Sequence, residues 1–263
     1  MKTIVLLKQV PDTAAQIMIA KDGKDIDKTS LSCIINPYDE YALEEALRIK
    51  EKTNGSVTVI SAGPEKVKDA LRSALALGVD SVVHIKDDAI EGSDSLGIAT
   101  LLAAACKTME YDIILCGKQA VDDDCALVGP MVAELLGLPH ASLIVKLGLS
   151  ADSKTALAHR EVEGGAEVVE LTLPALVTAQ KGLNEPRYAS LSGIMQAKKK
   201  PIQELNVQAL GIDASRVGKT GAKLEAISLA YPKERTAGKL LEGEIAAQAK
   251  EAARLLREEA KVI

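Results

Sequence analysis

The sequence IILCGKQAVDDDCALVGP, residues 113–130, decides the fold because it joins a buried strand to a helix through a polar loop. Its first four residues, Ile113–Cys116, are apolar and predict a buried strand, and Gly117 lets the backbone turn sharply at the strand's end. The apolar segment Met131–Leu136 predicts the helix that follows. A strand, a glycine turn, a polar loop and a helix are the parts of a ligand crevice at the carboxyl edge of a parallel sheet.

The loop between this strand and this helix has the chemistry of a nucleotide site. Backbone N–H groups of such a loop, together with a helix N-terminus, can bind phosphate. The three consecutive carboxylates, Asp122–Asp124, repel phosphate but suit ribose hydroxyls, which donate hydrogen bonds to an ionised acceptor. A solvated acidic loop with helix N-caps explains the same residues. The spacing by itself therefore leaves both a nucleotide site and a purely structural loop open.

Three more strands, each followed by a helix, are predicted before this stretch. The expected strands are Thr3–Leu7, Ser56–Ile60 and Ser81–Ile85, and the expected helices are Glu40–Lys52, Glu65–Leu77 and Ser95–Met109. Strands and helices thus alternate four times along the chain. This pattern predicts an α/β fold of the doubly wound, adenine-nucleotide-binding type, with a twisted parallel sheet covered by helices on both faces.

The pattern changes after Leu136. Four strands are expected as an antiparallel extension of the sheet, at Leu143–Leu147, Thr155–Val162, Ala166–Leu173 and Pro174–Ala179. Ser190 is expected to cap a short helix, and Leu224–Tyr231 is expected to be a last strand. The predicted α/β domain is residues 1–232, with the antiparallel extension at 143–180 and a loop at 183–202.

A helical arm is predicted at residues 233–263. A linker at Arg235–Gly238 leads to a terminal helix at Glu242–Ala260, whose apolar side is a narrow, alanine-rich stripe. Such a stripe needs a surface to pack on, because charged residues occupy the other sides of the helix. The sequence leaves open whether that surface is its own domain or a partner subunit.

Composition limits the ligands and partners. With 263 residues, 47% of them hydrophobic, the chain can bury a full core, and a net charge of −5 argues against a nucleic-acid partner. There is no Trp or Phe and there are only five Tyr, so a flavin or a base has few rings to stack on. Such a ligand would be held by backbone and polar groups, or shared with a partner.

Cysteine spacing and hydropathy bear on location. The four cysteines form no C-x-x-C pair and the three histidines are scattered, so no metal-ligand set is predicted. Reduced cysteines are typical of a cytoplasmic protein. The run Ile4–Leu7 is too short for a signal peptide, and Leu96–Cys106 is too short to insert into a membrane.

Several segments in order resemble the β (small) subunit of electron transfer flavoproteins over essentially the whole chain. The segments that carry the resemblance are Asn36–Asp39, Ala62–Pro64, Gly117–Asp124, Glu163–Gly165, Leu173–Pro174, Asn184–Leu191 and Arg235–Gly238. The resemblance implies a heterodimer with an α subunit and an FAD at the junction of the subunits. It implies a carrier, not an enzyme, that passes electrons from flavin dehydrogenases, such as acyl-CoA dehydrogenases, to a membrane quinone oxidoreductase or another acceptor.

The resemblance also implies a structural AMP in this subunit and assigns residues to it. The implied cofactor-binding residues are Leu6, Asn36, Pro37, Tyr38, Asp39, Ala62, Gly117, Lys118, Gln119, Ala120, Val121, Asp122, Asp123, Asp124, Cys125, Ala126, Leu127 and Val128. The implied partner-docking residues are Glu161, opposite a flavin-side arginine of the α subunit, and Arg187, Tyr188 and Leu191, in a recognition loop that Leu191 anchors on the dehydrogenase. Periodicity alone would make Leu191 a core leucine and Glu161 an outward residue of a strand.

Two departures from the plain carriers keep alternatives open. Ala126–Gly129 replaces their usual Asn-Gln-Thr-Gly, and Lys8–Thr13 and Val128–Pro130 are more similar to the electron-bifurcating branch, whose β subunit binds a second FAD in place of AMP and oxidises NADH. The three aspartates and the Asn184–Tyr188 segment match the carriers and favour AMP. A stand-alone adenine-nucleotide-binding protein of the same architecture, acting as a sensor or an adenylating enzyme, is the remaining alternative.

Overall fold

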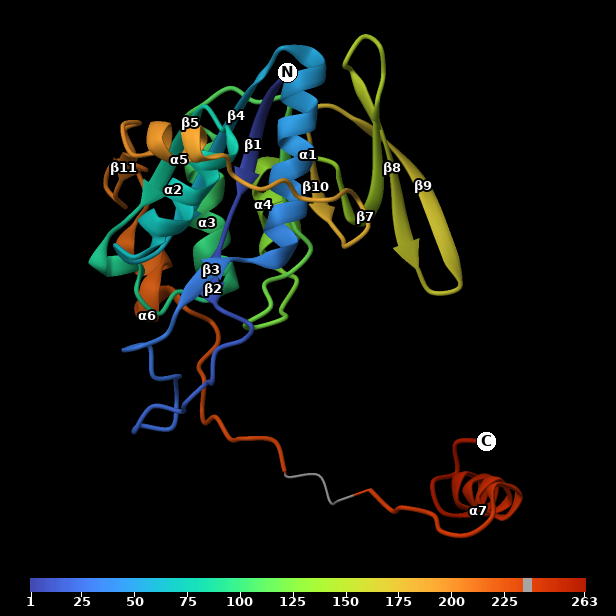
Figure 1. The fold of residues 1–263 in the computed structure, drawn as a ribbon. Helices are drawn as coiled ribbons and strands as arrows, with labels where there is room; N and C mark the ends of the chain where they lie inside the picture. The colour runs from blue at the N-terminus through green and yellow to red at the C-terminus, as the bar shows by residue number, and fades with distance from the viewer. Residues whose placement is uncertain (234–237) are drawn as a thin grey trace. The chain divides into compact units, whose positions relative to one another are not determined.

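The computed structural model describes residues 1–233 and 238–263, which fall into two compact units, Met1–Ile227 and Ser228–Ile263 (Figure 1). The predicted linker residues Arg235, Thr236 and Ala237 lie outside the described residues. Among the helices of the described ranges, none combines the length and the apolar character needed to cross a membrane.

The first unit is built on a mixed sheet that, within the described residues, has nine strands in the order β11-β5-β4-β1-β6-β10-β7-β8-β9. Neighbours pair in parallel from β11 through to β7, and β8 and β9 continue the sheet antiparallel. The strands of this sheet are β1 (Lys2–Leu6), β4 (Ser56–Ala62), β5 (Ser81–Ile85), β6 (Ile113–Gly117), β7 (His140–Leu149), β8 (Thr155–Val162), β9 (Gly165–Thr172), β10 (Ala175–Ala179) and β11 (Gln203–Leu205). A separate antiparallel pair is formed by β2 (Gln9–Pro11) and β3 (Cys33–Ile35).

Helices cover both faces of the parallel part, as the sequence predicted. On one face α1 (Pro37–Thr53) and α2 (Val67–Leu77) pack on Val5 of β1 and its neighbours, and on the other α3 (Ser95–Cys106) and α4 (Val128–Leu136) pack on Ile4 and Leu6. Successive residues of a strand point to opposite faces, so a strand buried on both sides needs an unbroken apolar run. This is why Ile113–Cys116 contains no polar residue.

The remaining helices are short or lie in the second unit. They are α5 (Leu191–Ala197), α6 (Gly218–Gly221) and α7 (Ile245–Glu258), with two 3-10 turns at Asp88–Ile90 and Ala214–Arg216. The N-cap expected at Ser190 is confirmed, because its Oγ accepts the Gly193 N–H at 3.0 Å.

Two strand predictions were wrong. The segment Pro174–Ala179 was expected in the antiparallel extension, but β10 is fully buried and pairs in parallel with both β6 and β7. Its five buried residues suit a strand with both faces covered, which only the parallel part of the sheet provides. The segment Leu224–Tyr231 has the alternation of a strand but forms no ladder within the described chain, and its side chains are exposed.

Other differences concern short elements and helix ends. Strands β2, β3 and β11 have only three residues each, too few for periodicity to reveal them. Helix α1 starts at Pro37, three residues before the predicted start, because proline is well suited to the first turn of a helix.

Candidate functional site

The candidate site lies at the ends of two neighbouring strands, β1 and β6, whose following helices, α1 and α4, pack on opposite faces of the sheet. In an open parallel sheet this arrangement leaves a crevice at the carboxyl ends of the two strands, and that crevice is where such folds bind ligands. The loop that follows β1 and the loop 118–127 after β6 both begin at this edge.

The carboxylate of Asp39, in the first turn of α1, joins the ends of β1 and β6. Its Oδ2 accepts the Lys8 N–H at 2.7 Å and its Oδ1 accepts the Gly117 N–H at 2.8 Å. Burial raises the pKa of this carboxyl to about 6, although the two N–H groups favour the charged form. A Cβ at Gly117 would lie 2.5 Å from Asp39 Oδ1, so this contact requires glycine.

The side chain of Asn36 fixes the next residues of the loop. Its Nδ2 donates to the Gln119 carbonyl at 2.9 Å, and its Oδ1 accepts the Val121 N–H at 3.1 Å. Asn36 and Asp39 are both almost fully buried and both hydrogen-bond to the chain itself. Two of the predicted cofactor-binding side chains therefore shape the loop, and their contact with a ligand stays a prediction.

Lys8, which was not predicted from the sequence as a site residue, forms ion pairs with two of the three loop aspartates. Its Nζ lies 2.8 Å from Asp122 Oδ1 and 2.8 Å from Asp123 Oδ2, while Gln119 Nε2 donates to Asp124 Oδ1 at 2.6 Å. Burial alone would lower the pKa of the Lys8 ammonium, but the two carboxylates outweigh burial and raise it. The only sequence signal for this role was the position of a lysine directly after the first strand.

The second half of the loop leads into α4. Asp124 and Ala126 adopt positive φ values of 50° and 54°, a conformation that costs a non-glycine residue about 1 kcal/mol. Gly129, in the first turn of α4, approaches β6 and β10 closely, because a Cβ there would lie 2.9 Å from both Cys116 Sγ and Thr178 Cγ2. The N-terminus of α4, whose first N–H groups have no partner within a helix, is thereby brought to the end of β6.

Other predicted cofactor residues lie in this loop or at the ends of strands β1 and β4. The Lys118 ammonium lies 4.9 Å from the centre of the Tyr38 ring, Leu6 is buried in the core beneath α3 and α4, and Ala62 ends β4. Leu127 is the N-cap residue of α4 and is partly exposed. The backbones of Asn36–Asp39 and Gly117–Val121 thus meet at one edge of the sheet.

A second surface of interest is the 184–197 segment, which contains α5. Leu191 is not a core residue, since it is 83% exposed, and Tyr188 is 97% exposed. Ile194 and Met195, which the sequence analysis did not single out, are also exposed. Residues 191, 194 and 195 have the spacing that places side chains on one side of a helix, so the pattern could have revealed them. We call Tyr188, Leu191, Ile194 and Met195 the α5 patch.

Arg187 and Glu161 have partners within the chain. The guanidinium of Arg187 hydrogen-bonds to two carboxylates of α1, Glu44 and Glu51. Glu161 lies on β8 and accepts a hydrogen bond from Gln180 Nε2 at 3.1 Å.

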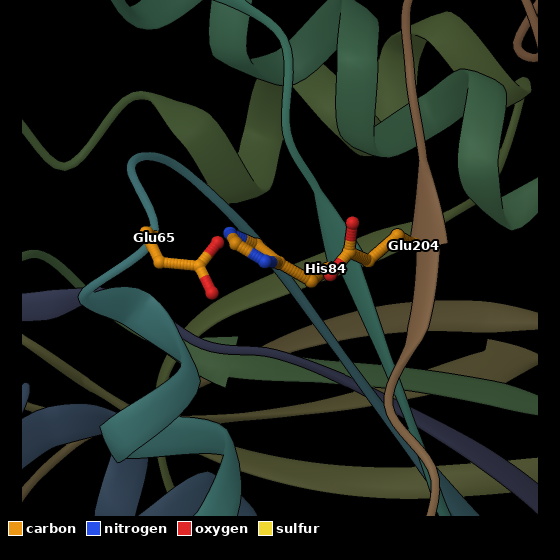
Figure 2. A group of neighbouring side chains, drawn as sticks. All are labelled: Glu65, His84 and Glu204. Atoms are coloured by element: carbon orange, nitrogen blue, oxygen red, sulfur yellow. The ribbon is translucent and has the colours of Figure 1, made fainter.

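A third cluster lies near the β11 edge of the sheet, on β5, β11 and the turn before α2. Figure 2 shows Glu65 and Glu204 on either side of His84. Each of the three residues has one atom that could bind a metal ion, and these three atoms lie within 4.8 Å of one another. His84 is fully buried, with Nε2 2.9 Å from the Gly63 carbonyl. The Lys68 ammonium lies between the two carboxylates, 2.6 Å from Glu204 Oε1, and Lys86 pairs with Glu65 at 2.7 Å. Because lysines already neutralise both carboxylates, we interpret the cluster as ion pairs that join β11 to α2.

Comparison with known proteins assigns the family. The family described as "Electron transfer flavoprotein domain" matches residues 26–210. A protein named electron transfer flavoprotein subunit beta from Bacillus subtilis is 46% identical over 264 aligned residues, which cover 100% of both chains. The chain belongs to the electron transfer flavoprotein family. Further similar proteins are the subunit beta of Thermoanaerobacterium thermosaccharolyticum, 40% identical over 93% of this chain and 94% of its own, and the mitochondrial subunit beta of Arabidopsis thaliana, 39% identical over 90% and 92%.

The segments that resemble electron transfer flavoproteins fall into separate places in the fold. Asn36–Asp39 and Gly117–Asp124 are hydrogen-bonded to each other at the crevice. Asn184–Leu191 lies against α1 through Asn184 and Arg187. Glu163–Gly165 forms the turn between β8 and β9. The described family segments therefore lie at the crevice, at the 184–197 segment and at the β8–β9 turn.

Proposed function

We propose that this chain is the β subunit of a heterodimeric electron transfer flavoprotein that carries electrons from flavin dehydrogenases, including acyl-CoA dehydrogenases, to a quinone oxidoreductase or another acceptor. The observation that carries the proposal is the α5 patch, a group of large solvent-exposed apolar side chains on a short helix and the segment before it. A patch of this kind is typical of a surface that docks on another protein. The α subunit would complete the heterodimer and contribute most of the FAD site.

The crevice is proposed to hold AMP. The first turn of α4 offers backbone N–H groups to a phosphate, and Lys8 reduces the repulsion from Asp122 and Asp123. Oxygens of these carboxylates can still accept hydrogen bonds from ribose hydroxyls, because each carboxylate has more than one acceptor site. The Gly129 contact, which brings the helix end against β6, fits a phosphate site built on backbone groups. An AMP bound here supplies structure and takes no part in the redox step.

FAD is proposed to lie at the junction with the α subunit. It supplies the electron-carrying chemistry when bound. This chain has no Trp or Phe with which to stack on an isoalloxazine ring, which favours a flavin site built largely by the partner. Glu161, on β8, is the residue of this chain proposed to face the flavin side of the partner. The unpaired cysteines suit a cytoplasmic protein.

A bifurcating subunit is the second candidate. Leu127, partly exposed at the N-cap of α4, stands where the plain carriers have a polar residue and would leave room for an isoalloxazine of a second FAD that oxidises NADH. A stand-alone nucleotide-binding protein is the third candidate, and it would need no partner subunit.

Extraction of the nucleotides from the purified heterodimer separates these candidates. Equal amounts of FAD and AMP, with both subunits co-purifying, support the carrier. Two equivalents of FAD and no AMP would replace the carrier with the bifurcating subunit. A stable chain that binds and hydrolyses ATP without the α subunit would exclude both.

A further inference from the structure

We infer that Arg187 is a positioning residue that clamps the 184–197 segment to α1 and so presents the α5 patch in one fixed orientation. The inference rests on the proposed docking role of that patch. The resemblance placed Arg187 among residues that face a partner, whereas its guanidinium points into its own subunit. Its effect on docking would therefore be exerted through the segment that it holds.

The contacts of Arg187 form a two-carboxylate clamp. Its Nε donates to Glu44 Oε2 at 2.7 Å, its Nη2 to Glu44 Oε1 at 3.1 Å, and its backbone N–H to Glu44 Oε2 at 3.2 Å. Both Nη1 and Nη2 donate to Glu51. Glu44 and Glu51 are seven residues apart on α1, so two helical turns place them on the same side. The planar, forked guanidinium matches two such carboxylates, and a lysine would not.

Glu44 is the buried half of the clamp. Its side chain is only 4% exposed, and it also accepts from Arg48 Nε at 2.8 Å. Burial alone would raise the pKa of the Glu44 carboxyl, but hydrogen bonds from Arg187 and Arg48 outweigh burial and hold the pKa below its usual value. Glu44 therefore stays ionised, and its attraction for Arg187 persists near neutral pH.

Further contacts show that the 184–197 segment is attached to the body on either side of the exposed α5 patch. Before the helix, Asn184 Nδ2 donates to the Tyr41 carbonyl and to Glu45 Oε2, both at 3.0 Å. At its last residue, Arg72 Nη1 donates to the Ala197 carbonyl at 2.6 Å. A seven-residue helix has little stability of its own, so these attachments decide where the patch points. A patch that is already ordered has less conformational entropy to lose when it docks.

The test uses the full heterodimer loaded with FAD and carrying Arg187→Gln or Arg187→Lys. The matched control is Lys50→Gln, which removes an ion pair of α1 that reaches Asp80 at 2.7 Å and not the 184–197 segment. Hydrogen exchange is followed on peptides that cover residues 186–197. Reduction of the heterodimer by an acyl-CoA dehydrogenase with its acyl-CoA substrate is measured over a range of heterodimer concentrations.

We expect Arg187→Gln to speed amide exchange across 186–197 and to raise the KM for the heterodimer by about tenfold. The kcat at saturation and the flavin content should stay within about twofold of the wild type, since Arg187 does not touch the crevice. Arg187→Lys should give an exchange rate and a KM between those of the wild type and Arg187→Gln, because lysine keeps the positive charge but lacks the forked guanidinium. The Lys50→Gln control should match the wild type in exchange across 186–197 and in KM.

Three outcomes would overturn the inference. These are unchanged exchange in Arg187→Gln, faster exchange with an unchanged KM, and loss of flavin or of the α subunit, which would make Arg187 a general stability residue. Failure of the wild type to accept electrons from the dehydrogenase would instead overturn the proposed function. The exchange measurement does not depend on the dehydrogenase, so the two failures are distinguishable.

Discussion

A few residues with buried polar side chains fix the geometry of the crevice. The Asp39 carboxylate accepts hydrogen bonds from backbone N–H groups at the ends of two strands. The Asn36 amide makes hydrogen bonds to one carbonyl and one N–H of the loop backbone. Leaving such buried backbone groups without partners costs about 1–3 kcal/mol each, so these side chains stabilise the loop as well as shape it. Gly117 completes the arrangement, because any side chain there would collide with Asp39.

At the residue scale, Asp39→Asn is expected to change how stability depends on pH. The folded pKa of about 6 lies above that of an unfolded aspartate, so the folded chain holds a proton that the unfolded chain has lost. The stability that this proton contributes is complete below about pH 4 and is lost as the pH rises through 6. The unfolding free energy of the wild type relative to Asp39→Asn should therefore fall by up to about 3 kcal/mol between about pH 4 and pH 7.

Urea unfolding of the chain at several pH values measures this difference. Asp69→Asn, which changes an exposed carboxylate of α2, is the control and should show no comparable trend. A wild-type advantage over Asp39→Asn that stayed constant across this pH range would contradict the prediction.

At the element scale, α5 shows how a short helix is held in place by contacts outside itself. Ser190 caps its first turn, and Gly193 lies so close to α2 that a Cβ there would be 2.3 Å from the Ala76 carbonyl. These contacts hold one side of the helix against the body and leave the α5 patch exposed. The exposed side chains contribute little to the core, so folding does not require them to be apolar, and binding to a partner would explain why they are.

Leu191→Ala is expected to impair electron transfer without affecting the fold. Truncation of an exposed side chain should change the unfolding free energy by less than about 0.5 kcal/mol. Loss of an interface anchor typically costs about 1–3 kcal/mol, which would lower kcat/KM for electron transfer from an acyl-CoA dehydrogenase by about 5-fold to 150-fold. Flavin content should not change.

Ile227→Ala is the matched control for this variant, since Ile227 is 84% exposed but lies in a coil outside the α5 patch. Electron transfer should be unaltered in the control. Unaltered kinetics in Leu191→Ala itself would remove Leu191 from the docking residues.

At the scale of the whole molecule, the chain consists of a compact body and a second unit that contains α7. None of the residues 245–258 of α7 is buried within this structure, although Ile245, Leu255 and Leu256 give it an apolar stripe. A single 14-residue helix is marginal in water unless its apolar side is covered. We propose that the α subunit covers it in the heterodimer.

Deletion of residues 239–263 is expected to separate the roles of the two units. The body, Met1–Ile227, should keep its thermal midpoint within about 2 °C, because its core lies entirely outside the deleted residues. Association with the α subunit should weaken by at least about tenfold, as measured by sedimentation or by titration of labelled subunits. An unchanged dissociation constant would mean that α7 does not contact the partner.

The sequence by itself determined the four alternations of strand and helix in the parallel part, the cover on both faces of the sheet, the Ser190 cap and the family. Each of these depends on local patterns: an unbroken apolar run marks a strand buried on both faces, and a cap acts over three residues. The family assignment depended on short segments in a fixed order along the chain, which need no knowledge of contacts.

Only the tertiary structure decided the place of β10, the partners of Asp39 and the direction of Arg187. These features depend on contacts between residues far apart in the sequence, with 78 positions between Asp39 and Gly117 and 143 between Glu44 and Arg187. Local periodicity predicts whether a residue is buried, but it does not predict which distant group its polar atoms bond to. For this reason the sequence offered the crevice and the 184–197 segment as candidate surfaces, and the fold showed which of their residues face outward and which hold the others in place.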